Sequence, residues 1–201
     1  MVAAALQGFA LGASLIIAIG AQNAFILRQG LLRAHVLVLC LICALSDALL
    51  IAAGVAGAGV LIAGRPVLLE IVTWGGAAFL LTYAALALRR ALRPEALRAG
   101  EAVAALWPAV LTALALTWLN PHVYLDTVIL LGALSAEFEG PARLAYGAGA
   151  VLSSFVWFFA LGYGARLLAP VFARPAAWRI LDLGIAAVMT AIAISLIWPR
   201  G

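Results

Sequence analysis

The sequence predicts an all-α membrane protein with about six transmembrane helices, arranged as two inverted three-helix repeats in which the first helix of each repeat is broken. The 201 residues are 67% hydrophobic and 10% charged, whereas a soluble domain is about half apolar and a quarter charged. The apolar residues form six long units. Units of the second half match units of the first half in the same order.

Each unit is long enough to cross a hydrocarbon core, which takes ~17–25 apolar residues. In chain order the units are Val2–Leu27, Val36–Ala63, Val67–Leu88, Ala102–Leu134, Leu144–Val171 and Ile180–Trp198. The N-terminus lacks the positive charge of a secretory signal, so we expect the first unit to remain as a span. We therefore expect one transmembrane domain over 1–201, with repeats at about 1–92 and 102–199 and a loop at 93–101.

The first unit shows signs of close packing and then of interruption. Gly8 and Gly12 are four residues apart, a spacing of small residues that suits close contact between membrane helices. The chain then reaches Gly20-Ala21-Gln22-Asn23, where a glycine is followed by two polar residues. This stretch predicts either a break in the helix or an ordinary helix end near the membrane surface.

The fourth unit contains the clearer interruption, at Asn120-Pro121. As one helix the unit would be about 50 Å long at ~1.5 Å per residue, which exceeds the ~30 Å of the hydrocarbon core. Asn is favoured as a helix N-cap and Pro at the first helical position, so we expect a half-helix to begin at Pro121. The free N–H groups and the partial positive charge at the start of this half-helix would then lie inside the membrane.

Matching positions support the repeat. Leu45-Ser46 in the second unit matches Leu152-Ser153 in the fifth at an offset of 107, and the third and sixth units match at an offset of 109. Because each half has an odd number of spans, the second half enters the membrane upside down. Many secondary transporters have this plan, with broken helices meeting near the midplane. Asn23 and Asn120 occupy the corresponding positions.

The arginines predict the orientation, because cytoplasmic connections carry the excess of positive residues. All twelve basic residues are arginines, nine of them in the first, third and fifth connections and three elsewhere. The nine-arginine side is expected in the cytoplasm, which places the C-terminus outside. The N-terminus lies outside with six spans and inside if one unit is re-entrant. The net charge of +4 comes from loops and helix ends, so we interpret it as a signal of membrane orientation and expect no nucleic-acid partner.

Two acids lie well inside apolar units, Asp47 in the second and Asp126 after the break in the fourth. Each costs ~2.5–3.5 kcal/mol at a helix centre on insertion scales, so a partner or a water-filled cavity must offset the cost. A structural ion pair is one explanation, and a functional site is the other. The remaining acids are assigned no chemistry, including Asp182, which is placed near a helix start.

An amino acid with a cationic side chain fits such a site. Its α-carboxylate could take N–H groups at Asn120–Val123 and around Asn23, while its guanidinium or ammonium faces Asp47 or Asp126. Either aspartate could instead carry the coupling proton. The predicted site is completed by Gln22, Ser46, Pro121, His122 and Tyr124. For His122, a structural hydrogen-bonded role is the alternative.

Two further functions remain open. A transporter of this fold could move a divalent metal between the aspartates, although two carboxylates are a thin ligand set. Cys40 and Cys43, the only cysteines, could form a membrane thiol–disulfide relay, although cysteine in an apolar helix behaves as a small hydrophobe. The sequence contains no motif of ATP hydrolysis or of hydrolases, so we expect neither an enzyme nor a cofactor nor a resident metal.

Two stretches carry a resemblance to a known family. Residues 12–30 (GASLIIAIGAQNAFILRQG) and residues 120–127 (NPHVYLDT) resemble the LysE/ArgO family of basic amino-acid exporters, and Ser46-Asp47 is similar to the family's second-helix position. The resemblance implies an inner-membrane exporter of arginine or lysine, driven by the proton motive force, with Asp47 and Asp126 as a functional pair. Export direction rests on the resemblance alone. The expected partners are a basic amino acid, protons and the lipid bilayer, and a homo-oligomer is compatible with the sequence.

Overall fold

The computed structural model describes residues 1–17, 20–59, 66–92 and 105–198, and every regular element in these ranges is helical. Four helices are long and apolar enough to cross a membrane, and the number rises to six if each of two bent helix pairs is one span. The predicted fold class, an all-α membrane protein with about six transmembrane helices, is confirmed. The inverted relation between the two halves stays a prediction.

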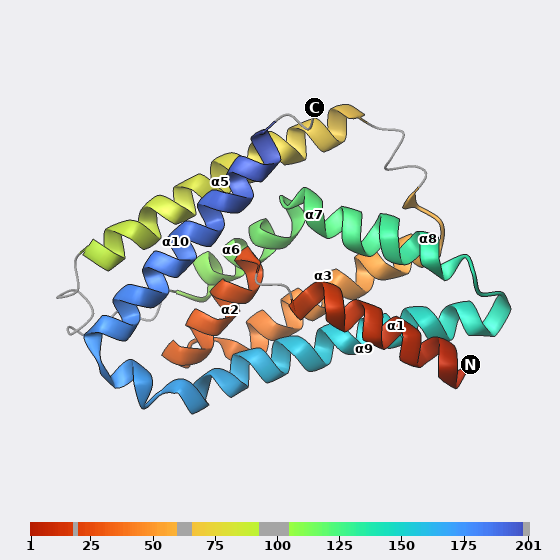
Figure 1. The fold of residues 1–201 in the computed structure, drawn as a ribbon, viewed down its shortest axis with the longest axis horizontal. Coiled ribbons are helices and arrows are strands. Elements are labelled where there is room, and N and C mark those ends of the chain that lie inside the picture. The colour runs from red at the N-terminus through yellow and green to blue at the C-terminus, as the bar shows by residue number, and fades with distance from the viewer. Residues whose placement is uncertain (18–19, 60–65, 93–104, 199–201) are drawn as a thin grey trace.

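The first predicted interruption is present. The axes of α1 (Val2–Ile17) and α2 (Ala21–Leu32) are bent by 79° relative to each other. In Figure 1 the pair leads from the N-terminus toward the other end of the molecule. The N-cap of α2 is Gly20, which has an extended backbone (φ −109°, ψ 174°), and no side chain caps the helix there.

α2 continues beyond Leu27, where the predicted unit ended. Arg28 and Gln29 extend the helix and are buried. The arginine count placed Arg28 in a connection, and this placement was wrong. The side chain lies inside the molecule, where it pairs with Asp182 of another helix. A charge can be buried when a partner is supplied, and here the partner comes from a helix about 150 residues later in the chain.

The second interruption is also present, at Asn120-Pro121. α6 (Leu106–Trp118) ends before it, and the chain continues as α7 (Pro121–Val123), the π-helix η2 (Tyr124–Leu130) and α8 (Leu131–Ser135). The two parts are bent by 57°. The π-helical turns were not predicted, and such turns frequently lie at functional sites.

The remaining helices are α3 (Val36–Val55), α5 (Pro66–Leu92), α9 (Gly140–Gly164) and α10 (Pro175–Ile197), with short 3-10 turns η3 (Ala165–Leu168) and η4 (Val171–Ala173). α3 ends near Gly57, whose φ is +95°, a conformation typical of helix ends. α10 begins earlier than predicted because Pro175 suits the first helical position. The predicted loop at 93–101 and residues 60–63 of the second unit lie outside the described ranges.

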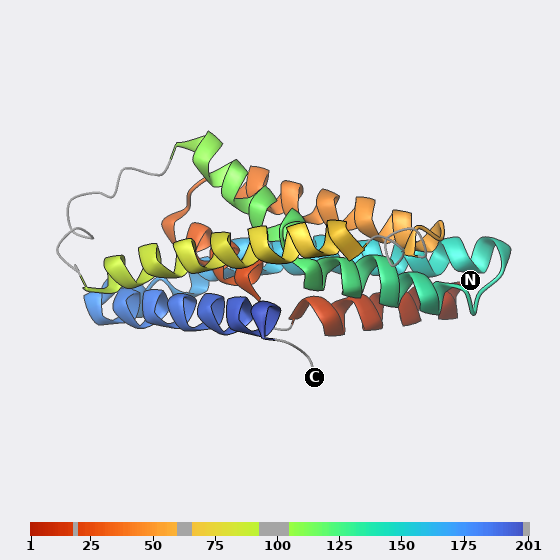
Figure 2. The same ribbon diagram turned by 90° about the horizontal axis from the view of Figure 1, so that it is seen from above.

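The helices approach closely where glycines face a neighbouring backbone. α1 lies along α9, and a Cβ at Gly8 would overlap the backbone carbonyl of Tyr146. A Cβ at Gly12 would overlap the Ser153 hydroxyl, also on α9. The small-residue contact predicted for the first unit is therefore confirmed. α5 and α10 lie side by side in both views (Figures 1 and 2).

Arginines gather at one end of the molecule. The C-terminal ends of α2, α5 and α9 and the N-terminal end of α10 lie together there (Figure 1). In or next to these helix ends are Arg33, Arg89, Arg90, Arg166, Arg174 and Arg179. We call this the arginine-rich end. The starts of α1 and α9 form the opposite end.

Candidate functional site

A cavity of about 280 Å³ lies where the two helix breaks meet. Its volume is near the lower end of the ~300–1,000 Å³ that small-molecule pockets span. Six of the nine predicted site residues line it: Gln22, Asn23, Asp47, Asn120, His122 and Asp126. The rest of the wall includes Ser154, Thr127 and glycine and apolar residues of α1, α3, α8 and α10. The structure therefore brings the polar residues of both breaks to one place.

The second break is closed by its own residues. The Asn120 side-chain oxygen accepts the His122 N–H at 3.1 Å, and the Asn120 carbonyl accepts the Val123 N–H at 3.1 Å. Pro121 has no N–H to offer. The predicted carboxylate site at Asn120–Val123 therefore lacks the free N–H groups on which it depended, because the N-cap uses the groups that the substrate would need.

The start of α2 is organised differently. The first intrahelical bond runs from the Ala24 N–H to the Gly20 carbonyl at 3.1 Å, so the N–H groups of Ala21 and Gln22 have no acceptor within the helix. The Asn23 side chain bridges the break. It donates to the Ile16 carbonyl at 2.6 Å, across the break. The α2 N-terminus therefore presents backbone N–H groups and a positive partial charge at the cavity.

The first two polar residues of α2 also hold this N-terminus in place. The Gln22 amide donates to the Thr117 hydroxyl of α6 at 2.9 Å. The Trp157 indole N–H of α9 donates to the Asn23 side-chain oxygen at 3.1 Å. These contacts attach the start of α2 to α6 and α9.

Asp47 is one of the two cavity carboxylates. It lies in the middle of α3 and is 5% exposed. The Ser154 hydroxyl of α9 donates to its Oδ2 at 2.9 Å. This hydrogen bond fixes the direction of the carboxylate but brings no positive charge.

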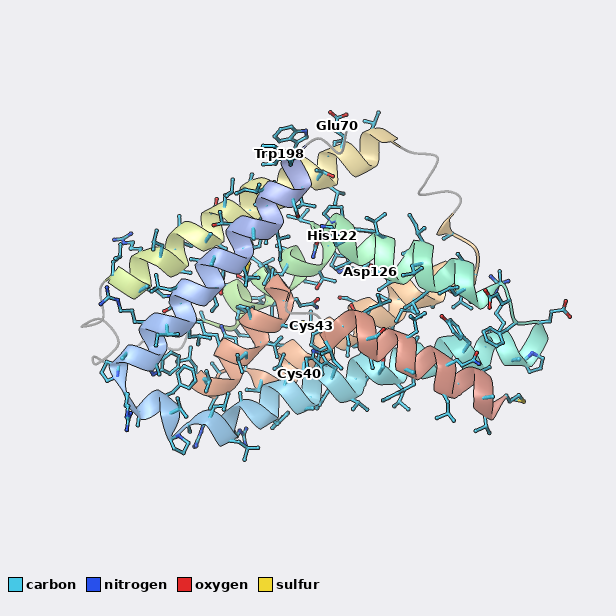
Figure 3. The ribbon with its side chains drawn as sticks, in the orientation of Figure 1. Cys40, Cys43, Glu70, His122, Asp126 and Trp198 are labelled. Atoms are coloured by element: carbon cyan, nitrogen blue, oxygen red, sulfur yellow. The ribbon has the colours of Figure 1, made fainter. Side chains whose placement is uncertain are left out.

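Asp126 is the other cavity carboxylate, and the π-helix η2 carries it. His122 precedes it by four residues, and both side chains lie on the side of this stretch that faces α1 and α3 (Figure 3). α3 approaches this stretch closely, since a Cβ at Gly54 would be 2.7 Å from the Thr127 carbonyl. The π-helix thus brings Asp126 to the cavity next to α3.

No arginine of the described residues forms an ion pair with Asp47 or Asp126. The described ion pairs go to Asp182, which is fully buried on α10; it accepts hydrogen bonds from Arg90 of α5, at 2.9 Å for Nη2, and lies 3.4 Å from Nε of Arg28 on α2. The prediction that only two acids lie deep inside the apolar units was therefore wrong. Local sequence does not reveal this burial, because the two arginines that pair with Asp182 are distant from it in the chain.

The other three predicted site residues lie beside the cavity and support its shape. Ser46 accepts the Trp118 indole N–H at 3.2 Å, which attaches α3 to the end of α6. The Tyr124 hydroxyl donates to the Trp118 carbonyl at 2.8 Å, across the second break. Pro121 is buried at the first position of α7.

Sequence reasoning missed several residues that the structure brings to the site. Ser154 and Thr127 line the cavity, and Thr117 and Trp157 hold the start of α2. Ser154 was within reach, because the offset of 107 that matches Ser46 with Ser153 also matches Asp47 with Ser154. The others have no signal of their own in an apolar sequence.

The two alternative functions gain little support. Cys40 and Cys43 are both fully buried with free thiols, and the Cys40 thiol donates to the Phe158 carbonyl at 3.2 Å (Figure 3). Among the described residues, no group of three or more His, Cys, Asp or Glu side chains is arranged to hold a metal ion.

Comparison with known proteins agrees with the helix pattern. A model of the LysE type translocator family matches residues 13–199. The chain is 46% identical over 198 residues to arginine exporter protein ArgO of Yersinia enterocolitica, with 98% of this chain and 97% of that protein covered. It is 46% identical over 200 residues to ArgO of Serratia proteamaculans, with 98% of each covered.

A Mycobacterium tuberculosis protein with a provisional name as an amino-acid transporter is 51% identical over 179 residues, with 89% of each chain covered. No solved structure matches the chain. Because the family model and the relatives both extend over nearly the whole length, the chain belongs to the LysE type translocator family.

Proposed function

We propose that this chain is a secondary transporter that exports cationic amino acids, L-arginine and/or L-lysine, from the cytoplasm. The names of its relatives support amino-acid export, and two of those names specify arginine. The observation that carries the substrate class is a cavity with two carboxylates and, among the described residues, no arginine paired with either of them. These names point to a transporter and not to an enzyme.

The cation end of the proposed site is formed by Asp47 and Asp126. A guanidinium or ammonium group would pair with these carboxylates and offset their cost of burial. Ser154 holds Asp47 in position without neutralising it. A neutral amino acid has only its α-ammonium as a cationic group and would leave one of the two carboxylates without a charged partner, which selects against it.

The anion end of the proposed site is the α2 N-terminus. The backbone N–H groups of Ala21 and Gln22 have no acceptor within the helix, and both residues line the cavity together with the two acids. An α-carboxylate there would accept these N–H groups and benefit from the helix dipole. This assignment replaces the Asn120–Val123 stretch, where the N-cap already uses the N–H groups.

The two halves contribute to the proposed site in an inverted relation. Asp47 and Ser154 occupy equivalent positions at the offset of 107 and are hydrogen-bonded to each other. Asn23 and Asn120 lie at the two breaks that border the cavity. Direct contact between equivalent residues is what an inverted repeat produces near its pseudo-two-fold axis, so this contact supports the predicted repeat.

The proposed setting is the bacterial cytoplasmic membrane, with the arginine-rich end in the cytoplasm, and proton coupling through one of the two aspartates. The gathering of six arginines in or next to four neighbouring helix ends supports this orientation. The side of the C-terminus follows from the same argument and is outside.

The proposal is tested by counter-transport in proteoliposomes. Labelled arginine, lysine and leucine are offered at a controlled pH gradient to the protein and to its Asp47→Asn and Asp126→Asn variants. We expect exchange of arginine or lysine but not of leucine, and at least tenfold slower exchange in each variant, since a hydrogen bond to a charged group is worth ~1.5–3 kcal/mol. Glu137→Gln is the control, because Glu137 is an exposed acid outside the cavity.

Wild-type exchange rates in both Asn variants would refute the role of the acidic pair. Uptake of a divalent metal without amino-acid exchange would favour the metal-transport alternative. Transport that is unaffected by the pH gradient would remove proton coupling while leaving the substrate assignment intact.

A further inference from the structure

α2 is the helix on which the further inference rests, because it is buried on most of its surface. Eight of its 12 residues are buried, whereas α1, on the other side of the break, buries three of 16. α2 contacts α3, α6, α9 and α10. These four helices surround the short helix α2, which fills the interior of the bundle between them.

α2 lies between the cavity and the arginine-rich end. Its first residues line the cavity, and its last turn reaches the arginine-rich end (Figure 1). Phe25 and Ile26, one turn below the cavity, are 2% and 1% exposed. A solute that leaves the cavity toward the arginine-rich end must therefore pass α2.

The cavity extends in the other direction. Apart from the start of α2, its wall includes Gly12, one turn before the end of α1, and Ile51, one turn after Asp47 on α3. α3 begins beside the end of α2 and runs toward the opposite end (Figure 1). The cavity wall is thus formed by α2 on the side of the arginine-rich end and by α1, α3 and α8 on the side of the opposite end.

A buried ion cluster fastens α2 in this position. Asp182 of α10 is fully buried, and its Oδ1 accepts the Arg90 Nε at 3.1 Å and Nη2 at 2.9 Å. The Arg28 Nε of α2 lies 3.4 Å from the same oxygen. The Arg90 guanidinium also lies over the Tyr83 ring, at 5.7 Å, and Tyr83 contacts Phe25 of α2 edge to face. The cluster therefore joins α2, α5 and α10.

Polar atoms on α10 and α2, two of the helices that the cluster joins, are incompletely satisfied. Asp182 Oδ2 and Gln29 Oε1 are buried without a hydrogen-bond partner among the described residues. A buried polar group without a partner is costly, whereas one that water reaches is not. A second arrangement, in which α2 moves and water enters, would satisfy these atoms. These atoms therefore favour a contact between α2 and α10 that can break and re-form.

We propose that Arg28, Arg90 and Asp182 close the cavity toward the arginine-rich end by holding α2, and that this closure opens in the transport cycle. The inference rests on the proposed function only in that a solute crosses through the cavity. The two repeats of the chain differ at the positions of this cluster. The offset of 97 that relates Asn23 to Asn120 places Leu125 opposite Arg28, and the offset of 109 places Thr73 opposite Asp182, so the other half has no equivalent charged cluster.

The test measures access to the cavity and needs no substrate. In a Cys40→Ala, Cys43→Ala background, Leu15→Cys places one thiol at the cavity wall. A membrane-impermeant cationic methanethiosulfonate is added to vesicles from either side. With the cluster intact, we expect modification from the side of the opposite end. With Asp182→Asn or Arg90→Gln, we expect modification from the arginine-rich side to rise about tenfold or more, as the closed population falls.

Arg89→Gln is the matched control, because Arg89 is the exposed neighbour of Arg90 on the same turn and lies outside the cluster. If Asp182→Asn does not fold, the double variant Arg28→Gln, Asp182→Asn removes both buried charges and keeps the test. Arg90 is 25% exposed, so Arg90→Gln is the milder change.

The proposal is overturned if folded Arg90→Gln and Asp182→Asn proteins show the same access from the arginine-rich side as Arg89→Gln. It is also overturned if the thiol reacts mainly from the arginine-rich side while the cluster is intact. Either result concerns access alone, so it is distinguishable from a failure of the amino-acid assignment, which only the exchange assay measures.

Discussion

Ser154 shows how one side chain prepares the cavity. Its hydroxyl donates to Asp47 Oδ2 at 2.9 Å, while the neighbouring Ser153 donates to the Ala150 carbonyl of its own helix at 2.7 Å. The two serines are both buried, yet only one touches the carboxylate. Substitutions at these two positions can therefore distinguish the positioning of Asp47 from the general effect of removing a buried hydroxyl.

We predict that Ser154→Ala weakens apparent arginine affinity about tenfold, because a hydrogen bond to a charged group is worth ~1.5–3 kcal/mol. Ser153→Ala is the control, and we expect its affinity to stay close to wild type. Concentration dependence of arginine exchange in proteoliposomes measures both. Equal affinities in the two variants would show that Ser154 does not position Asp47.

Asn120 acts on the break itself. Its side chain caps α7 through the His122 N–H, and loss of an N-cap costs ~0.5–2 kcal/mol. We predict that Asn120→Ala lowers thermal stability in detergent and slows exchange, while Asn120→Ser keeps both near wild type because serine also caps helices. A stability of Asn120→Ala equal to that of Asn120→Ser would contradict this role.

At the scale of elements, the contact of α1 with α9 decides how closely the first span approaches the bundle. The backbones meet at Gly8 with no room for a Cβ, whereas a Cβ at Gly184 of α10 would meet nothing within 4 Å. The same substitution should therefore have opposite consequences at these two positions.

We predict that Gly8→Ala destabilises the protein by ~1–3 kcal/mol, as expected for overpacking. We expect Gly184→Ala to be neutral or stabilising, because alanine is ~1 kcal/mol more favourable than glycine inside a helix. Thermal unfolding followed by size-exclusion chromatography compares them. A Gly8→Ala protein as stable as Gly184→Ala would mean that α1 is not held tightly against α9.

At the scale of the whole molecule, arginine placement and helix ends together predict the topology. Arg174 precedes α10 at the arginine-rich end, and Glu139 precedes α9 at the opposite end. In the Cys40→Ala, Cys43→Ala background, we predict that Arg174→Cys is labelled from the cytoplasm and Glu139→Cys from outside. Reversed labelling in intact cells would contradict the orientation. Normal arginine exchange by the background protein would also remove the thiol relay.

The helix breaks were largely predictable from local sequence. Asn120-Pro121 is an N-cap followed by a first-position proline, and local chemistry at these residues suffices to start a helix. Gly20 permitted a break, but only the structure decided between a break and a helix end. The π-helical turns that carry Asp126 have no local signal, because they result from how this stretch packs against α3.

The sequence by itself determined the membrane class, the approximate spans, the break at Asn120-Pro121 and the two cavity acids, because each depends on hydrophobicity or on residues close together in the chain. Only the tertiary structure decided the rest. Ser154 reaches Asp47, and Arg28 and Arg90 reach Asp182, across more than 90 residues. The fold also brings the start of α2, which no N-cap side chain caps, to the cavity, while Asn120 caps the other half-helix. Such pairings depend on which helices are neighbours, and that is a property of the packed bundle.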